Sequence, residues 1–307
     1  MPPPAVRERR TRLAGFETRI LSSPGSGPPV VFIHGFADSA DCWRPAIDGL
    51  ARAGRATCAI DLPGFGTADP MRRGPILPQI DAVLDDLIED RARRSGGAGV
   101  ILCGNSLGGC AVMRAAERGG PITALVPVAP AGLDLARWIG VIESERLLGP
   151  LVTSPIPVPR PLVREVVGRA YRALAFSEQH RVDQESIASF ASHLADVPTL
   201  RRVLETGRRL VPELKNPFRL HRITAPLLMV WGVRDRLVFP SGAQRVLDAL
   251  PHARLELIEN CGHCPQVERP ARLVELLLGE PGPAAIPRLE ESDEPQERQP
   301  KRLRRRR

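Results

Sequence analysis

The sequence is poor in aromatic residues and almost devoid of lysine. Phe, Trp and Tyr together make up 4% of its 307 residues, and Lys215 and Lys301 are the two lysines among 43 basic residues. We interpret the excess of arginine as a bias of the coding sequence and not as a sign of function. Apolar residues (43%) and charged residues (25%) are present in ordinary globular proportions, which excludes a fibrous or wholly disordered chain.

Hydrophobic segments typical of membrane insertion or secretion are also missing. The longest uncharged stretch, residues 95–113, contains six glycines together with Asn105 and Ser106, which argues against a lipid-facing helix. The arginines of residues 1–20 are not followed by the apolar core of a signal peptide. The six cysteines are too dispersed for a disulfide scaffold. We therefore expect a cytoplasmic protein with reduced thiols.

Much of the net charge of +8 is located at the C-terminus. Residues 301–307 carry six positive charges, so the rest of the chain is only mildly basic. A nucleic-acid-associated protein would explain such a cluster, but a short basic run without interleaved aromatic residues is more typical of a solvated tail. We predict no stable nucleic-acid or membrane partner and only a weak contact of this tail with an anionic surface.

Strand and helix patterns alternate along most of the chain, and no segment repeats with a period of 20–50 residues. Short apolar runs predict strands at residues 29–33, 56–60, 99–103, 122–128, 226–231 and 254–258. Helical periodicity is found at residues 76–94, 107–117, 242–250 and 267–278. The alternation predicts an α/β fold, with a mostly parallel central sheet covered by helices on both faces.

The alternation stops after about residue 134. A proline-rich segment and two amphipathic helical stretches, residues 162–174 and 185–194, take its place before the strands resume. After residue 280, Pro, Glu, Gln and Arg replace the apolar residues. The predicted organisation is an N-terminal arm (1–16), a core (17–133 and 223–280), a helical cap or lid (134–222) and a disordered basic tail (281–307).

The segment Gly104-Asn-Ser-Leu-Gly-Gly109 lies between a predicted strand and a predicted helix. In this context the G-x-S-x-G pattern predicts a sharp, strained turn that projects the hydroxyl of Ser106 outward. The glycines leave room where side chains would collide with the adjoining strand and helix. The N-terminus of the helix favours negative charge beside the hydroxyl. Ser106 is therefore the candidate nucleophile.

A serine nucleophile needs an imidazole base that is oriented by a carboxylate. Among the six histidines, His263 lies in a glycine-containing loop after the last predicted strand. Asp235 follows another buried strand, which places it at the same carboxyl edge of the sheet as Ser106. A surface ion pair with a neighbouring arginine is the alternative role for Asp235, and Asp134 is the reserve candidate for the acid.

The chain order Ser106, Asp235, His263 resembles the nucleophile, acid and base of the α/β-hydrolase family. Three further segments are similar to motifs of that family, and the resemblance extends over roughly residues 17–280. These segments are His34-Gly-Phe36, Asp61-Leu-Pro-Gly-Phe-Gly66 and Gly262-His-x-Pro-x-x-Glu-x-Pro270.

The resemblance also implies an oxyanion hole. Its donors would be the backbone N–H groups of Phe36 and Leu107, and donors fixed by the backbone stabilise a developing oxyanion by about 3 kcal/mol each. His34 is then expected to be a structural loop residue. Asp61 and Gly64 are expected to shape a turn beside the site without a chemical role.

Cys261-Gly-His-Cys264 resembles the redox motif of protein disulfide isomerases, but the context differs. In that family an aromatic residue precedes the motif, whereas Asn260 precedes it here. A zinc site would need two more ligands at suitable spacing, which the sequence does not offer. We therefore predict neither a redox function nor a metal or cofactor.

These features together predict a serine hydrolase that cleaves a small, apolar carboxylic ester through an acyl-enzyme. The elbow around Ser106 also resembles that of carbon–carbon bond hydrolases of aromatic ring cleavage, which act on vinylogous diketones. A non-catalytic binding protein with the same fold is a further alternative. Trp138, Leu147 and Phe176 are candidates for lining the substrate pocket.

Overall fold

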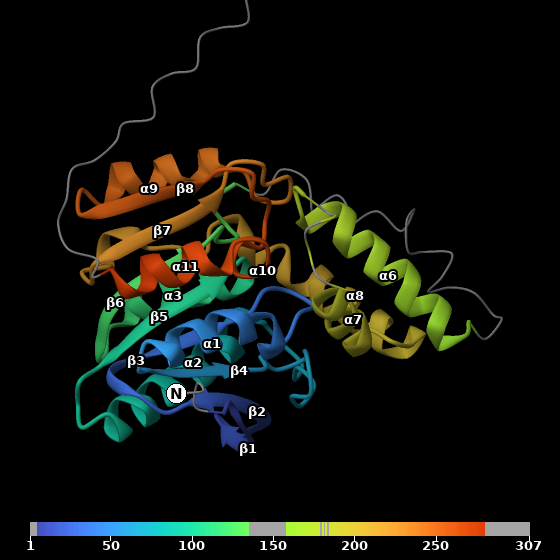
Figure 1. Ribbon diagram of the computed structural model, residues 1–307, viewed down its shortest axis with the longest axis horizontal. Helices are drawn as coiled ribbons and strands as arrows, with labels where there is room; N and C mark the ends of the chain where they lie inside the picture. Colours follow the sequence, from blue (N-terminus) through green and yellow to red (C-terminus); the bar gives the residue numbers. More distant parts are fainter. Residues whose placement is uncertain (1–4, 135–157, 179, 181, 183, 280–307) are drawn as a thin grey trace, which may run out of the picture.

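The computed structural model describes residues 5–134, 158–178, 180, 182 and 184–279, which form an eight-stranded sheet (Figure 1). The strand order is β1-β2-β4-β3-β5-β6-β7-β8. β1 and β2 pair antiparallel, as do β2 and β4, and all other neighbours are parallel, so the predicted mostly parallel sheet is confirmed. The strands are β1 (Arg7–Leu13), β2 (Phe16–Ser23), β3 (Ser26–Ile33), β4 (Arg55–Ile60), β5 (Val100–Asn105), β6 (Ile122–Val128), β7 (Leu227–Gly232) and β8 (Ala253–Ile258).

The first two strands are absent from the sequence-based prediction. β1 lies within residues 1–16, which were expected to form an arm, and it pairs with β2 from Arg7 opposite Ser22 to Leu13 opposite Phe16. Most side chains of β1 are exposed, so the strand has no apolar face to reveal it. Its arginines suit a sheet edge, because charged side chains discourage pairing with another chain.

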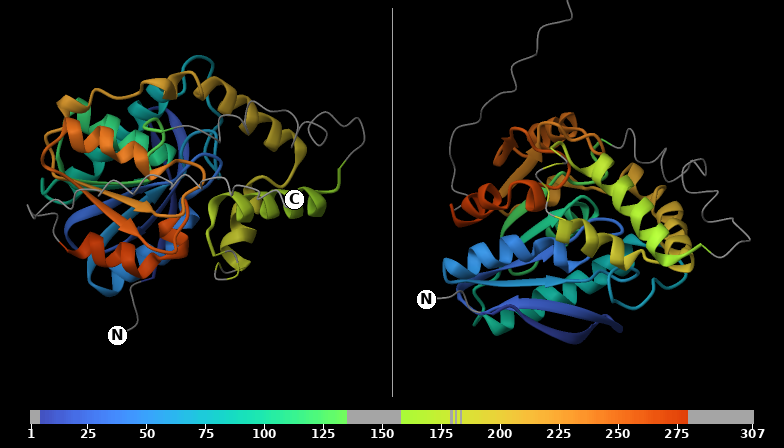
Figure 2. Two further views of the ribbon diagram at one scale, coloured as in Figure 1. Left: turned by 90° about the horizontal axis from the view of Figure 1, so that it is seen from above. Right: turned by 45° about the vertical axis from the view of Figure 1, so that its right-hand side comes forward.

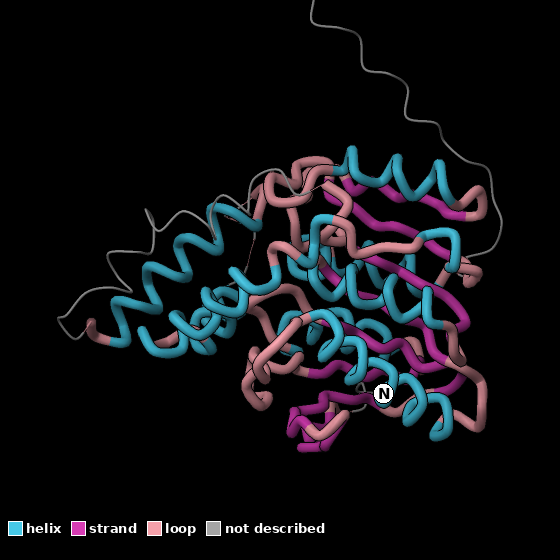
Figure 3. Tube along the Cα trace, turned by 180° about the vertical axis from the view of Figure 1, so that it is seen from behind, coloured by secondary structure: helices cyan, strands magenta, loops and turns pink. Residues whose placement is uncertain are grey.

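Helices cover both faces of the sheet, as predicted (Figure 3). Helices α2, α3 and α9 pack against one face, on side chains such as Ile33 and Leu102, while α1 and α11 pack against the other, on Phe32 and Ile101. No helix in the described part of the chain is both long enough and apolar enough to span a bilayer. The helices of these two layers are α1 (Arg44–Arg52), α2 (Leu77–Arg94), α3 (Leu107–Arg118), α9 (Ala243–Ala249) and α11 (Pro270–Leu278), with the short α10 (Pro265–Glu268) before the last.

Three more helices lie together beyond one end of the strands (Figure 1, yellow-green to gold). They are α6 (Arg160–Ala175), α7 (Gln184–His193) and α8 (Val197–Leu210), and we call them the α6–α8 layer. Asp196 caps α8 by accepting from the N–H of Thr199 at 2.9 Å. The two helical stretches predicted in this region are thus confirmed. Residues 135–157 of the predicted cap and 281–307 of the predicted tail lie outside the described residues, as do Trp138 and Leu147.

The carboxyl edge of the sheet gathers the loops that carry the candidate residues. Strands β3, β5, β7 and β8 are parallel to one another and end at this edge, where open α/β sheets bind their ligands. The following loops hold Phe36, Ser106, Asp235 and His263, respectively. The α6–α8 layer lies beside the same edge (Figure 2).

Candidate active site

Ser106 occupies a tight turn between β5 and α3. Its backbone has φ 54° and ψ −112°, and a positive φ is uncommon for a residue with a side chain. The N–H of Ser106 donates to the carbonyl of Val128 (2.9 Å), and its own carbonyl accepts from the N–H groups of Cys110 (2.9 Å) and Ala131 (3.0 Å). Surrounding contacts of this kind hold a strained backbone in place, and such strain is concentrated at functional sites.

Two glycines allow this turn to pack against its neighbours. A Cβ atom on Gly108 would lie 2.1 Å from the carbonyl oxygen of Ile33, and one on Gly104 would lie 2.3 Å from the carbonyl oxygen of Gly108. The first turn of α3 therefore lies directly on β3 without an intervening side chain. This close approach is the physical reason for glycine on both sides of Ser106.

We expect Gly108→Ala to be strongly destabilising, by more than about 3 kcal/mol, because the backbone that its methyl group would meet cannot give way. Urea denaturation would measure the loss. Gly96→Ala is the matched control: its Cβ would meet nothing within 4 Å, and only its φ of +68° is unfavourable. That variant should lose about 1–2 kcal/mol. Equal losses for the two variants would contradict the packing argument.

The imidazole of His263 is paired with Asp235. The Nδ1 atom of His263 lies 2.7 Å from Oδ2 of Asp235, and both side chains are buried. The other carboxylate oxygen, Oδ1, accepts from the backbone N–H groups of Leu237 (2.8 Å) and Val238 (3.1 Å). Three contacts thus fix the carboxylate, which in turn orients the ring so that its Nε2 atom is left for other partners.

The reserve acid lies elsewhere. Asp134 accepts a hydrogen bond from the hydroxyl of Ser241 at 2.7 Å. The structure therefore brings Asp235 to the imidazole of His263 and pairs Asp134 with a serine.

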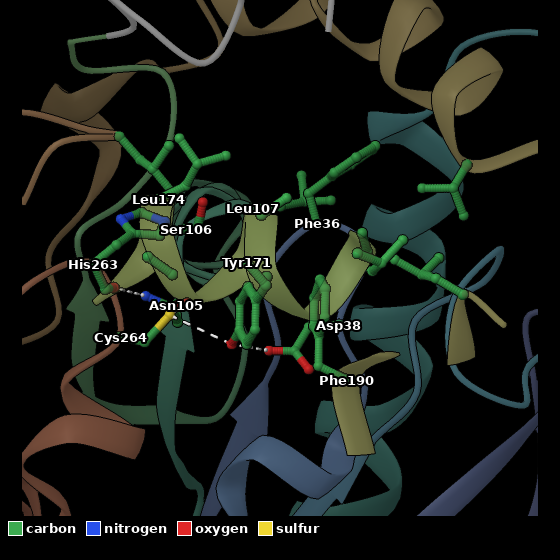
Figure 4. Close-up of a pocket in the computed structure, with 18 of the residues that line it drawn as sticks. Phe36, Asp38, Asn105, Ser106, Leu107, Tyr171, Leu174, Phe190, His263 and Cys264 are labelled. Carbon is green, nitrogen blue, oxygen red and sulfur yellow. Dashed lines mark hydrogen bonds between the residues drawn. The ribbon is translucent and has the colours of Figure 1, made fainter. Parts of the chain in front are cut away.

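Ser106 and His263 line one cavity of about 210 Å³ between the carboxyl edge and the α6–α8 layer. Figure 4 shows the imidazole beside the Ser106 hydroxyl, with Leu107 and Phe36 nearby. Leu107 is the first residue of α3, so no carbonyl within the helix can accept from its N–H. Phe176 is buried against Tyr171 and is not among the lining residues, so that prediction was wrong. The apolar walls come mainly from Val167, Leu174, Phe190, Leu200, Val203, Leu204 and Leu237.

Comparison with known proteins agrees with this architecture. Residues 30–276 match the family model described as "Alpha/beta hydrolase family". The chain belongs to the α/β-hydrolase family. It is 25% identical over 272 residues to monoacylglycerol lipase ABHD6 of Homo sapiens, covering 83% of this chain and 75% of that protein.

Two further relatives show the range of the family. The chain is 28% identical over 278 residues to 2-hydroxy-6-oxo-6-(2'-aminophenyl)hexa-2,4-dienoic acid hydrolase of Metapseudomonas resinovorans, covering 87% of this chain and 88% of that enzyme. The crystal structure of a membrane phospholipase A, described as a bacterial virulence factor, superposes with a TM-score of 0.69 at 26% identity, covering 89% and 84% of the two chains. The fold and family expected from the sequence are thus confirmed, and the relatives support a hydrolase.

Asn105 supports the His263 loop from the elbow of this α/β hydrolase. Its Nδ2 atom donates to the carbonyl of His263 (2.9 Å), and its Oδ1 atom accepts from the side chain of Gln266 (3.1 Å). These bonds join the residue before Ser106 to the loop that carries the imidazole. Sequence reasoning gave Asn105 no role of this kind, although its place beside Ser106 was a signal.

Glu268 connects the same loop to the α6–α8 layer. One carboxylate oxygen accepts from the N–H of Gly262 (2.6 Å), and the other accepts from the N–H (2.8 Å) and the hydroxyl (2.9 Å) of Ser177. The N–H of His263 itself donates to the carbonyl of Ala175, the last residue of α6, at 2.8 Å. Glu268 belongs to the last family motif, and the sequence alone does not indicate its contact with Ser177.

His34 has the geometry of a structural residue. Its Nδ1–H donates to the carbonyl of Gly35 (2.7 Å), and its Nε2 atom accepts from the N–H of Leu62 (2.8 Å), an arrangement that needs a neutral ring. Complete burial lowers the pKa of His34 to about 4, which keeps the ring neutral. Asp61 accepts from Arg19 and from the backbone of Thr67, so it too shapes a loop.

The two thiols beside His263 are buried and not joined in a disulfide. Burial raises the pKa of both Cys261 and Cys264, so both remain protonated thiols and poor nucleophiles. Among the described residues, no cluster of His, Cys, Asp and Glu could hold a metal ion.

We expect the Cys261→Ala and Cys264→Ala variants to retain hydrolase activity within about tenfold of the wild type, because neither thiolate is available and packing alone is altered. Steady-state kinetics on a p-nitrophenyl ester would measure this. An insulin-reduction assay tests the alternative redox function. Disulfide reduction by the wild type that disappears in Cys261→Ala would contradict the interpretation that these thiols only pack.

Asp38 is an unusual acidic group in the wall of the apolar cavity. Its Oδ1 atom accepts from the N–H of Ser39 (2.8 Å), whereas its Oδ2 atom lies 3.5 Å from the hydroxyl of Tyr171. Burial raises the pKa of Asp38 to about 6. The folded state therefore binds this proton more tightly than the unfolded chain, and ionisation of Asp38 destabilises the fold as the pH rises through 6.

Asp38→Asn should accordingly stabilise the protein at pH 8 by about 1–3 kcal/mol and should have little effect near pH 3, where Asp38 is mostly protonated in both states. The amide oxygen retains the bond to Ser39. Urea denaturation of both proteins at pH 8 and at pH 3 would measure the difference. A gain that is independent of pH would show that ionisation of Asp38 is not its cause.

Proposed function

We propose that this α/β hydrolase cleaves carboxylic esters through an acyl-enzyme on Ser106. The observation that carries the proposal is that Ser106 and His263 line one cavity. Ser106 has a strained backbone at the N-terminus of α3, and the imidazole of His263 lies 2.7 Å from the buried carboxylate of Asp235. A strained elbow, a base and an orienting acid are the parts that nucleophilic acyl transfer requires.

The reaction would begin with attack of the Ser106 oxygen on the ester carbonyl. Nε2 of His263 takes the hydroxyl proton, while Nδ1–H donates to Asp235, which stabilises the imidazolium. The carbonyl oxygen becomes an oxyanion that accepts from the N–H groups of Leu107 and Phe36. The imidazolium then gives its proton to the departing alkoxide. Water attacks the acyl-enzyme by the same steps, releasing the acid and restoring Ser106.

The cavity walls indicate the class of substrate. The side chains from α6, α7 and α8 that line the cavity are mostly apolar, which favours an apolar acyl chain next to the scissile carbonyl. The α6–α8 layer would serve as the cap that excludes water from this chain. The ester-cleaving relative, a monoacylglycerol lipase by name, supports this choice.

A fluorophosphonate probe tests the proposal directly, because it phosphonylates only an activated serine. We expect labelling of the wild-type protein, with the adduct mapped to Ser106 by peptide mass spectrometry, and hydrolysis of p-nitrophenyl esters of graded chain length. An unlabelled Ser106 in the folded protein would instead favour the non-catalytic binding protein.

Carbon–carbon bond hydrolysis is the second candidate. The observation in its favour is the 28% identity over 87% of the chain to a hydrolase of a 2-hydroxy-6-oxo-dienoic acid. Assaying a vinylogous diketone beside the esters separates the two reactions. Turnover of the diketone with kcat/KM at least tenfold above that of every ester would make this the principal activity.

A further inference from the structure

A second cavity of about 310 Å³ adjoins the one that contains Ser106. It lies between α8 and the segment of residues 64–73 that follows β4. Ala37, Leu194 and Val203 line both cavities, so the two are separated by a few small or apolar side chains. A ligand that occupies both cavities would pass these shared residues.

Helix α8 divides the two cavities by the chemistry of its faces. Leu200 and Leu204 line the apolar cavity, whereas Arg202 and Arg209 line the second one. The opposite wall of the second cavity contributes Arg73. Three arginines thus line this space, which adjoins a cavity whose walls are mostly apolar.

The remaining charged side chains of the second cavity leave an excess of positive charge. Glu205 contributes one negative charge. His193 also lines the cavity, and its Nε2 atom is 3.3 Å from Oδ2 of Asp41, a carboxylate already paired with Arg19. Three arginines and one carboxylate give the second cavity a net positive charge, which favours the binding of an anion.

Two of the arginines are held by local contacts. Arg209 donates to the carbonyl of Arg72, and also to that of Gly74, so it fixes the loop that carries Arg73. Arg202 donates to the hydroxyl of Thr199 at 2.9 Å. The guanidinium groups of Arg73 and Arg202 retain further N–H donors, since each has five.

We propose that this second cavity binds an anionic group, a carboxylate or a phosphate, at the far end of the acyl chain whose ester is cleaved at Ser106. The inference rests on the ester hydrolysis proposed above. Arg73 and Arg202 are the residues that bind the anion, because the planar guanidinium fork matches both oxyanions. The substrate is then an amphiphilic ester, apolar in the middle and charged at the end remote from the scissile bond.

The test compares p-nitrophenyl esters of straight-chain acids with esters of the same length that end in a carboxylate or a phosphate. We expect the wild-type ratio of kcat/KM, charged over neutral, to rise to a maximum at one chain length, where the anion reaches the arginines. In the double variant Arg73→Gln, Arg202→Gln that ratio should fall about tenfold. Preference for carboxylate or for phosphate identifies the natural group.

Two single variants sharpen the result. Glu205→Gln removes the negative charge and should raise the ratio. Arg164→Gln, on the exposed side of α6 and outside both cavities, should leave it unchanged and so controls for the loss of one positive charge. A ratio that the double variant leaves unaltered, or that Arg164→Gln lowers equally, would overturn the inference.

Failure of the inference is distinguishable from failure of the proposed function. Hydrolysis of neutral esters with no dependence on Arg73 and Arg202 would leave ester hydrolysis intact and remove the anion site. If no ester were hydrolysed, calorimetric titration of the monomethyl ester of a long dicarboxylic acid into the wild-type protein would decide whether the second cavity binds an anion. Binding that weakens about tenfold in the double variant would support the anion site, and no binding at millimolar concentration would overturn it.

Discussion

Ser106→Ala should lower kcat for a p-nitrophenyl ester by at least about 10³-fold, because removing one member of such a triad abolishes most of its contribution. The Ser106 oxygen is the atom that would form the acyl-enzyme, and burial keeps the neighbouring thiol of Cys264 protonated, so it cannot replace the serine. The fluorophosphonate label should disappear in the same variant. Single-turnover and steady-state kinetics with the purified protein would measure the loss.

The control for this variant is structural. The hydrogen bonds that hold the elbow use the backbone of Ser106, not its hydroxyl. The melting temperature of Ser106→Ala should therefore lie within a few degrees of that of the wild type. Ser95→Ala, at the end of α2 and away from the cavity, should keep full activity. Activity near that of the wild type in Ser106→Ala would show that another residue is the nucleophile.

Asp235→Asn should lower kcat by about 10³–10⁴-fold, through the tautomer of His263. The backbone N–H groups of Leu237 and Val238 already donate to Oδ1, so the introduced amide would keep its oxygen there and turn its NH₂ group toward Nδ1 of His263. Nδ1 would then have to accept, and the ring proton would move to Nε2. A protonated Nε2 cannot take the proton from Ser106.

This mechanism predicts a specific pattern of results. Fluorophosphonate labelling of Asp235→Asn should slow in parallel with kcat while the labelled residue remains Ser106. Asp134→Asn is the matched control and should retain activity, because Asp134 bonds to Ser241. Loss of activity in Asp134→Asn together with a silent Asp235→Asn would reassign the acid.

The parts of the fold that the sequence predicts are those with strong hydrophobic periodicity. The buried parallel strands are nearly continuous apolar runs, and all six predicted strands are present within a few residues. β1 was missed because it is stabilised mainly by backbone pairing with β2, which leaves no apolar pattern. The predicted helix at residues 267–278 is divided at Arg269, because Pro270 disfavours helical geometry in the residue that precedes it.

The candidate site was predictable to the extent that strand ends determine it. Ser106, Asp235 and His263 each follow a parallel strand, so their shared edge follows from topology alone. Contacts between distant side chains follow no such rule. Neither the hydrogen bond that Ser177 donates to Glu268 nor the contribution of α8 to the cavity wall can be derived from the spacing of residues in the sequence. The choice of Phe176 for that wall failed for the same reason. Phe176 directly follows the last residue of α6, and its ring packs against that of Tyr171 instead of lining the cavity.

The bonds between the His263 loop and the end of α6 restrict how the α6–α8 layer can move. Ala175 and Ser177 are tied to His263 and Glu268, so raising this end would release the imidazole from its support. Arg209 and His193 also join this layer to the core, through the carbonyls of Arg72 and Gly74 and through Asp41. Any opening of this layer that keeps His263 supported would therefore have to leave residues 175–177 in place.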